Sequence, residues 1–215
     1  MQLILGPSWD HVVHYAMTQL FMKARLKIWG TKGSQAVSNE LSQLHLRDTF
    51  RPINPRSLSK SDYDKVLESH LFLKQKRDQT IKGRMVAGGN KQRNHIDRTD
   101  ATSSTADLES VLLTETIDSK EGRDIAIVDI PNAFVTKRIK NKDDIATIRL
   151  RGKLSELMVA AAPEIYKKYV TINMKGELVI YVEALNALYG IMKAALLFYI
   201  KFFANLKSVG FELNP

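Results

Sequence analysis

The stretch DIAIVDIPNAF, residues 124–134, places an acid and an aromatic ring where they could act together. The apolar run 125–128 predicts a buried strand that ends at Asp129. A carboxylate there is costly unless it is exposed, paired or bound to a cation, and Mg²⁺ suits a carboxylate that also faces substrate phosphates. Phe134 could then support the sugar of a nucleotide. The alternative is that Asp129 only caps the turn at Pro131, and the stretch taken alone favours that alternative.

Composition and charge narrow the class of protein. The 215 residues can form one large domain or two small ones, and 44% hydrophobic with 26% charged residues is typical of a globular chain. The formal charge of +9 favours a polyanionic partner, nucleic acid ahead of a membrane surface, although it can also serve solubility alone. Cysteine is absent, which excludes disulfides and thiolate zinc sites and fits an intracellular protein.

Neither the first residues nor the longest apolar stretch of the sequence predicts secretion or a membrane span. The opening MQLILGPSW lacks the basic start, the long apolar core and the cleavage site of a signal peptide, so we expect a protein that is not secreted. The long apolar stretch 184–206 carries Lys193 and Lys201. A lysine inside a bilayer is costly, so this stretch predicts a buried helix and no membrane partner.

A basic hairpin is the clearest local prediction. Residues 70–76 and 80–88 are two strand-like runs around the polar turn 77–79. Basic side chains cluster on or beside it, either as a surface for a polyanion or as a defence against edge-to-edge aggregation. They are Lys74, Lys76, Arg77, Lys82, Arg84, Lys91 and Arg93.

Hydrophobic periodicity and turn residues predict the other elements of a mixed α+β fold. Before the hairpin we expect a helix at 11–28 ended by Gly30 and Gly33, a short helix from Ser38, an extended connector at 47–62, and a helix capped by Ser61 or Asp62 up to about residue 69. After it we expect a polar loop at 90–105, a helix capped by Ser104 or Thr105 and stopped by Gly122, and strands at 124–129 and 144–151. A helical stretch within 153–169, a hairpin at 170–183 turning at Lys175-Gly176 and a helix at 191–207 are expected to follow.

Four blocks of the sequence form a recognisable series: KGRMVAGGNKQ (82–92), TSSTADLESVLLTETID (102–118), DIAIVDIPNAF (124–134) and LNALYGIMKAALLFY (185–199). In this order they resemble the reverse transcriptase domain of Ty1/copia-type retrotransposons. Members of that family show a K-x-R-L-V-A-like stretch, a strand ending D-x-x-x-A-F, and L-Y-G-L-K-Q-A-P-R-x-W. The likeness covers roughly residues 65–215.

The resemblance implies a right-hand polymerase with fingers and a partial palm, built as an antiparallel sheet with packed helices. Residues 1–64 would be an upstream connecting segment, 65–123 a fingers-like region, and 124–215 a partial palm. The reaction would be addition of a dNTP to a DNA primer on an RNA template, with two Mg²⁺ ions, inside a retroelement polyprotein that works in a cytoplasmic particle or the nucleus.

The resemblance also assigns roles to residues. Asp129 matches the first metal-binding aspartate, the Ile130 carbonyl would help to coordinate the second ion, and Phe134 matches the aromatic that stacks under the deoxyribose. Lys82 and Arg84 fall where fingers residues hold the triphosphate, and alternate strand positions point both side chains to the same face. Gly190 matches the glycine that packs near the template base and the nucleotide. The remaining basic residues would contact nucleic acid: Lys74, Lys76, Arg77, Lys91 and Arg93.

The chain also departs from the family. The block at 192–196 reads MKAAL where the family has K-Q-A-P-R, and the later aspartate pair has no counterpart. The pair Asp143-Asp144 follows 140–142 (KNK) and not an apolar strand, so we expect a solvated turn there. One aspartate cannot hold two hard cations. We therefore expect a truncated domain that is inactive by itself; the alternatives are a non-catalytic basic module that binds RNA or DNA, and a decayed retroelement remnant.

Overall fold

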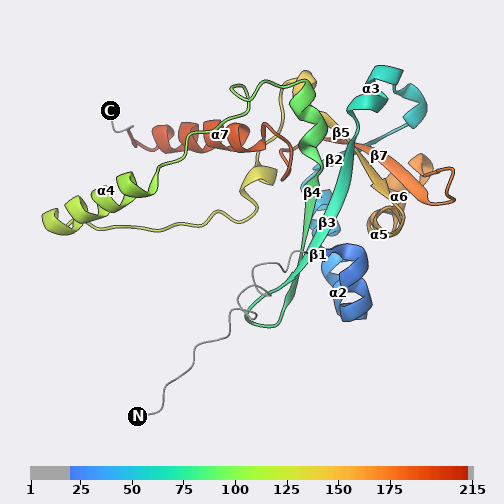
Figure 1. Cartoon of the computed structure of the whole chain (residues 1–215), viewed down its shortest axis with the longest axis horizontal. Helices are drawn as coiled ribbons and strands as arrows, with labels where there is room; N and C mark the ends of the chain where they lie inside the picture. Colours follow the sequence, from blue (N-terminus) through green and yellow to red (C-terminus); the bar gives the residue numbers. More distant parts are fainter. Residues whose placement is uncertain (1–19, 213–215) are drawn as a thin grey trace, which may run out of the picture.

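The computed structural model describes residues 20–212, which form a mixed α+β fold around one sheet (Figure 1). The strand order is β1-β3-β5-β7-β2, with β4 paired to β3 and β6 paired to β7. All pairs are antiparallel except β3 with β5, which run parallel, so the expected antiparallel sheet is mixed at that point. The strands are β1 Leu20–Phe21, β2 Phe50–Ile53, β3 Leu67–Gln75, β4 Ile81–Ala87, β5 Ala146–Arg151, β6 Thr171–Ile172 and β7 Leu178–Ala184.

Helix α2 (Met22–Leu46) covers one face of the sheet. Val37, Leu41 and Leu44 repeat at helical spacing, and all three are buried in the core. Gly30 has non-helical angles (φ 46°, ψ −121°), so the predicted break at Gly30 is confirmed. Gly33 lies inside the helix, which continues through Ser38 and does not restart there. Residues 11–19 of the expected first helix lie outside the described residues.

The remaining helices are short or peripheral. Helix α5 (Lys153–Ala161) packs beside α2, and buried Tyr166 of α6 meets His45 of α2 with its hydroxyl 3.2 Å from Nδ1. Burial raises the pKa of Tyr166 to about 12. The other helices are α3 Lys60–Lys65, α4 Leu108–Glu121, α6 Pro163–Tyr166 and α7 Ala194–Ser208; the 3-10 turns are η1 Pro55–Ser57, η2 Gly89–Asn94, η3 Ala133–Thr136, η4 Lys142–Asp144 and η5 Lys167–Tyr169.

The β3–β4 hairpin is present as predicted, although β3 begins at Leu67. Its register sets Phe72 opposite Arg84 and Lys74 opposite Lys82. Side chains alternate between faces along a strand. The buried face holds Leu71, Leu73, Gly83 and Met85, and the basic side chains of both strands are exposed. The hairpin therefore gathers its cations on the face turned away from the core.

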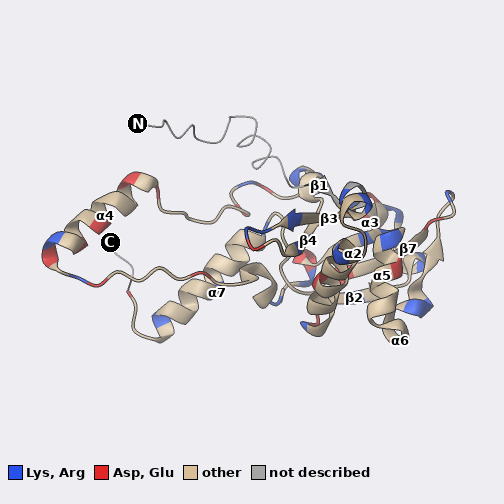
Figure 2. Ribbon diagram, turned by 90° about the horizontal axis from the view of Figure 1, so that it is seen from below, with Lys and Arg blue, Asp and Glu red and all other residues tan. Residues whose placement is uncertain are grey.

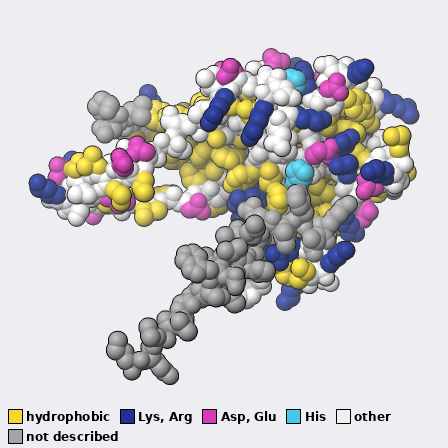
Figure 3. All heavy atoms as spheres, viewed as in Figure 1, with side chains coloured by type: hydrophobic (Ala, Val, Ile, Leu, Met, Phe, Trp, Pro, Cys, Tyr) yellow, Lys and Arg dark blue, Asp and Glu magenta, His cyan; other side chains and the backbone are white. Residues whose placement is uncertain are grey.

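Helix α4 projects from the body as an arm (Figure 1). None of its residues is buried, and Figure 3 shows hydrophobic side chains exposed along it. Asp107, not Ser104 or Thr105, caps the helix by accepting from the Ser110 amide at 2.7 Å. Gly122 ends it in the left-handed conformation (φ 67°), as predicted.

The prediction of a strand at 124–129 is wrong. These residues are an irregular segment, and Ile125, Ile127 and Val128 are 52%, 94% and 79% exposed. A strand needs a neighbour that accepts its backbone hydrogen bonds, and no strand of residues 20–212 lies in register beside this run. An apolar run alone is therefore not enough to form one.

Several other boundaries need correction. The segment 47–62 contains β2, which pairs with β7. Ser59, with Asp62 in a capping box, begins α3, and this helix stops at Lys65 because β3 follows. Helix α7 begins at Ala194 and is partly exposed at Ile200 and Phe202, so it is not the buried helix expected. The predictions of β5, of the helical stretch within 153–169 and of the hairpin at Lys175-Gly176 are confirmed.

No helix of residues 20–212 is both long and apolar enough to cross a bilayer.

Candidate functional site

The exposed face of the β3–β4 hairpin forms a basic hollow of about 440 Å³. Lys82 and Arg84 approach it from β4, and Lys74 from β3. No acidic side chain lines it, so the hollow concentrates positive potential and suits phosphate groups. Figure 2 marks lysine and arginine along the ribbon. We call this surface the basic hairpin face; it consists of Phe72, Lys74, Gln75, Lys76, Arg77, Lys82 and Arg84.

Arg84 is held in place by an aromatic ring from a distant part of the chain. Its guanidinium carbon lies 4.6 Å from the centre of the Tyr189 ring, a cation–π contact. Tyr189 in turn packs on Phe134, with ring centres 4.7 Å apart. Phe134 also meets Phe198 of α7 at 5.9 Å. Phe134 is thus half-buried inside an aromatic cluster, and it links the segment after Asp129 to the basic hairpin face.

The loop that carries Tyr189 is fixed to the hairpin by backbone contacts. The Ala87 amide donates to the Tyr189 carbonyl at 2.7 Å, and the Met192 amide donates to the Gln92 side chain at 3.0 Å. Gly190 has φ +87°, and a Cβ on it would lie 1.9 Å from the Ala87 carbonyl oxygen. Only glycine permits this approach. The structure therefore gives Gly190 a packing role at the junction of the blocks 82–92 and 185–199.

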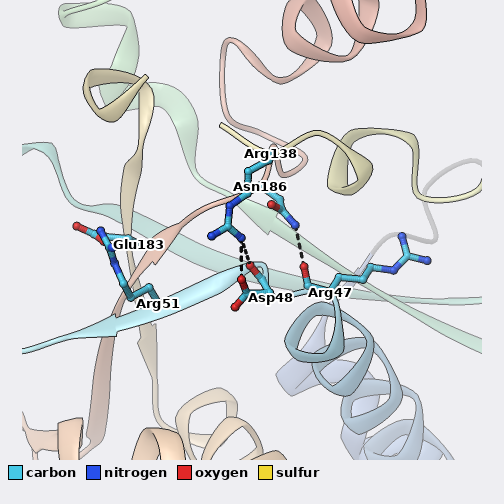
Figure 4. A network of polar contacts seen from close by, with 6 residues as sticks. All are labelled: Arg47, Asp48, Arg51, Arg138, Glu183 and Asn186. Atoms are coloured by element: carbon cyan, nitrogen blue, oxygen red, sulfur yellow. Dashed lines mark hydrogen bonds and ion pairs between the residues drawn. The ribbon is translucent and has the colours of Figure 1, made fainter. Parts of the chain in front are cut away.

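A polar network anchors the other end of the same loop (Figure 4). Asn186 donates to the Arg47 carbonyl at 3.0 Å, and Arg138 donates to both the carbonyl and the carboxylate of Asp48 at 2.9 Å. Arg51 binds Glu183 through Nε at 2.6 Å. The contacts of Asn186 and Arg138 tie the turn between α2 and β2 to the segments at 186 and 138, and the Arg51–Glu183 contact joins β2 to β7. The position of Tyr189 relative to the hairpin is thus set from two sides.

Glu40 of α2 is a half-buried acid at the edge of this site that the sequence patterns did not reveal. Its Oε1 accepts a hydrogen bond from the Met85 amide of β4 at 3.0 Å. Burial raises the pKa of Glu40 above its ordinary value, and this outweighs the opposing effects of the Met85 amide and of nearby Lys82 and Arg84. No local sequence pattern could have identified Glu40, because its contact with Met85 joins residues that lie far apart in the chain.

Asp129 and Ile130 do not lie in a metal site in this structure. Asp129 is exposed in the irregular segment, and Ile130 is partly exposed. Among residues 20–212 there is no group of three or more His, Cys, Asp or Glu side chains that could hold a metal ion. Two Mg²⁺ ions need several carboxylates around them, so these residues do not fit the ions that the resemblance implies.

Asp143 and Asp144 lie in η4, a turn as expected, but Asp144 is only partly exposed to solvent. Its Oδ1 lies 2.8 Å from Lys193 Nζ, and its side chain is 16% exposed. Asp144 raises the pKa of Lys193 by accepting this hydrogen bond. The pair therefore anchors the loop 191–193 to η4.

Lys91 and Arg93 lie apart from the basic hairpin face. Both are exposed residues of η2. Lys91 lines a separate hollow of about 270 Å³ together with Lys65 and Lys193. The structure thus gathers Lys74, Lys76, Arg77, Lys82 and Arg84 on one face and does not bring Lys91 into that hollow.

Comparisons with known proteins identify no relative. No family model, no curated protein and no solved structure matches the chain.

Proposed function

We propose that this chain is the fingers and part of the palm of a Ty1/copia-type reverse transcriptase domain. By itself the chain binds nucleic acid but does not add nucleotides to a primer. The basic hairpin face carries the proposal. It presents five cations around one hollow that no acid lines. Such a surface neutralises phosphates and gives binding that does not depend on base sequence.

The arrangement of the blocks supports the polymerase part of the proposal. The hairpin at 82–92, Phe134 and the loop at 185–190 are separate in the sequence, and each resembles a part of a nucleotide-binding site. Arg84, Tyr189 and Phe134 bring them into direct contact. In this proposal the incoming dNTP and the RNA–DNA duplex lie along the basic hairpin face.

The exposed segment 124–129 supports the description as a partial palm. Ile127 and Val128 are almost fully exposed, although they have the composition of a buried strand. We propose that this segment becomes a strand when another strand pairs with it, and that such a strand supplies the carboxylates that Asp129 lacks for Mg²⁺.

The 215-residue chain is expected to bind a primer–template equally well with Mg²⁺ and with EDTA at the same ionic strength, within about twofold, because its contacts to phosphate come from lysine and arginine. In the same preparation, primer extension with dNTPs and Mg²⁺ is expected to be absent. Fluorescence anisotropy measures the binding, and gel analysis of a labelled primer measures extension.

Two outcomes would contradict the proposal. Binding that requires Mg²⁺ would place metal, not the basic side chains, at the centre of recognition. Extension by the wild-type chain that Asp129→Ala abolishes would show a complete catalytic site in the chain as it stands. The Glu164→Ala variant is a suitable control, because Glu164 is an exposed acid on α6.

A further inference from the structure

Helix α2 approaches β4 closely enough to place a carboxylate against its backbone. A Cβ on Gly83 would lie 2.9 Å from the Ala36 carbonyl oxygen, so the helix and the strand pack there without an intervening side chain. Glu40 follows Ala36 by about one helical turn and meets Met85, which follows Gly83 by two residues. The hydrogen bond at 3.0 Å from the Met85 amide is the consequence of this close packing.

Glu40 thereby closes the open edge of β4. This strand pairs with β3 on one side only. Residues two apart in a strand turn their amides to the same edge, and the Met85 and Ala87 amides are both bonded outside the sheet. The Ala87 amide donates to the Tyr189 carbonyl, and the Met85 amide donates to Glu40. A side-chain carboxylate therefore takes the place of a neighbouring strand at this point.

The charged groups facing Glu40 are cations, and two of them also line the basic hollow. These two are Lys82 and Arg84 of β4, and the third is Arg47 in the turn after α2. Gln43, Asn132 and Tyr189 complete the surroundings without adding an acid. Glu40 is thus a negative charge held among the positive charges that we assign to phosphate binding.

We propose that the Glu40 carboxylate competes with nucleic-acid phosphates for Lys82 and Arg84, so that protonation of Glu40 strengthens nucleic-acid binding. This inference rests on the proposed function of the basic hairpin face. At neutral pH the carboxylate cancels part of the positive field of these two cations. At lower pH the neutral acid leaves that field to the ligand. Linkage requires the reverse effect as well: bound phosphates favour protonation of Glu40.

Burial raises the pKa of Glu40, so this side chain takes up a proton at a higher pH than an ordinary glutamate does. Because the folded pKa of Glu40 is raised, the folded state takes up the proton more readily than the unfolded state. The resulting stability is fully present below the unfolded pKa and is lost as the pH rises through the folded pKa. Glu40→Gln keeps an oxygen that can accept from the Met85 amide, so its Tm at neutral pH is expected to be no lower than that of the wild type.

The test compares wild-type protein, Glu40→Gln and Glu164→Gln in binding an oligothymidylate, whose bases do not titrate between about pH 4.5 and 7.5. At neutral pH and low salt, Glu40→Gln is expected to bind about three- to tenfold more tightly than the wild type. The gain in affinity on lowering the pH is expected to be smaller in Glu40→Gln. Glu164→Gln is expected to match the wild type at each pH, because Glu164 lies neither beside Glu40 nor in the basic hollow.

The outcomes separate this inference from the proposed function. Salt-sensitive binding by the wild type with equal affinity and equal pH dependence in Glu40→Gln would overturn the role of Glu40 alone. Absence of binding in all three proteins would overturn both. If Glu40→Gln does not fold, NMR titration of Glu40 in the wild type decides: saturating oligothymidylate is expected to raise its pKa, and an unchanged pKa would overturn the inference.

Discussion

Gly190→Ala is expected to destabilise the protein strongly, because the loop that carries Gly190 packs directly on β4. The new Cβ would lie 1.9 Å from the Ala87 carbonyl oxygen and 2.8 Å from the Val86 side chain. Backbone cannot move aside as a flexible side chain can, and the residue already has φ +87°. Strain at positive φ and forced separation of the loop from β4 together are expected to cost about 3 kcal/mol or more in the free energy of unfolding.

Chemical denaturation measures this loss, and Gly176→Ala is the matched control. Gly176 also has a positive φ, 75°, but a Cβ there meets nothing within 4 Å. Its alanine variant is expected to lose only about 1 kcal/mol, the cost of the backbone conformation alone. Equal losses in the two variants would contradict the close contact between the loop and β4. The same contact positions Tyr189, so Gly190→Ala is also expected to weaken nucleic-acid binding.

The double variant Lys82→Ala/Arg84→Ala is expected to lose about 10- to 100-fold in affinity for a primer–template at low salt, since each phosphate contact adds to the electrostatic free energy of binding. Both side chains lie on the exposed face of β4, and the buried face of the strand is untouched. Stability is therefore expected to fall by only about 1 kcal/mol, for the lost cation–π contact between Arg84 and Tyr189. Anisotropy titrations measure the affinity, and a thermal melt checks the fold.

Lys167→Ala/Lys168→Ala removes the same charge from an exposed turn in η5, distant in sequence from the hairpin. Its affinity is expected to fall by about twofold at most, which is the effect of net charge at a distance in salt. A similar loss in both double variants would mean that the chain binds through its overall charge of +9 and not through the basic hairpin face.

Local sequence patterns predicted those elements whose partners are close in the chain. The hairpin around 77–79 and the hairpin at Lys175-Gly176 are each fixed by their own turn and alternation. Helix α4 stops at Gly122 because only a residue suited to positive φ ends a helix in this way. Caps were less predictable: several Ser, Thr and Asp residues precede each helix, and the geometry of the chain selects Ser59 and Asp107.

The site depended on contacts that no local pattern encodes. Arg84 and Tyr189 are brought together from distant blocks, as are Glu40 and Met85. The run 124–129 shows that local composition can also predict an element that does not form. Its composition is that of a buried strand, yet a strand forms only beside a partner, and residues 20–212 place none there. Residue type and spacing could therefore single out Asp129 as a candidate, but they could not predict its surroundings in the fold.

The most direct test of the account is the salt dependence of primer–template or single-strand binding by the wild type and by Lys82→Ala/Arg84→Ala. If the basic hairpin face neutralises three to five phosphates, a plot of log affinity against log salt for a single strand is expected to have a slope of about −2 to −3.5. The double variant is expected to have a slope shallower by about 1.4, for the two contacts removed. A wild-type slope near zero, or the same slope in both proteins, would contradict the assignment of nucleic-acid binding to this face.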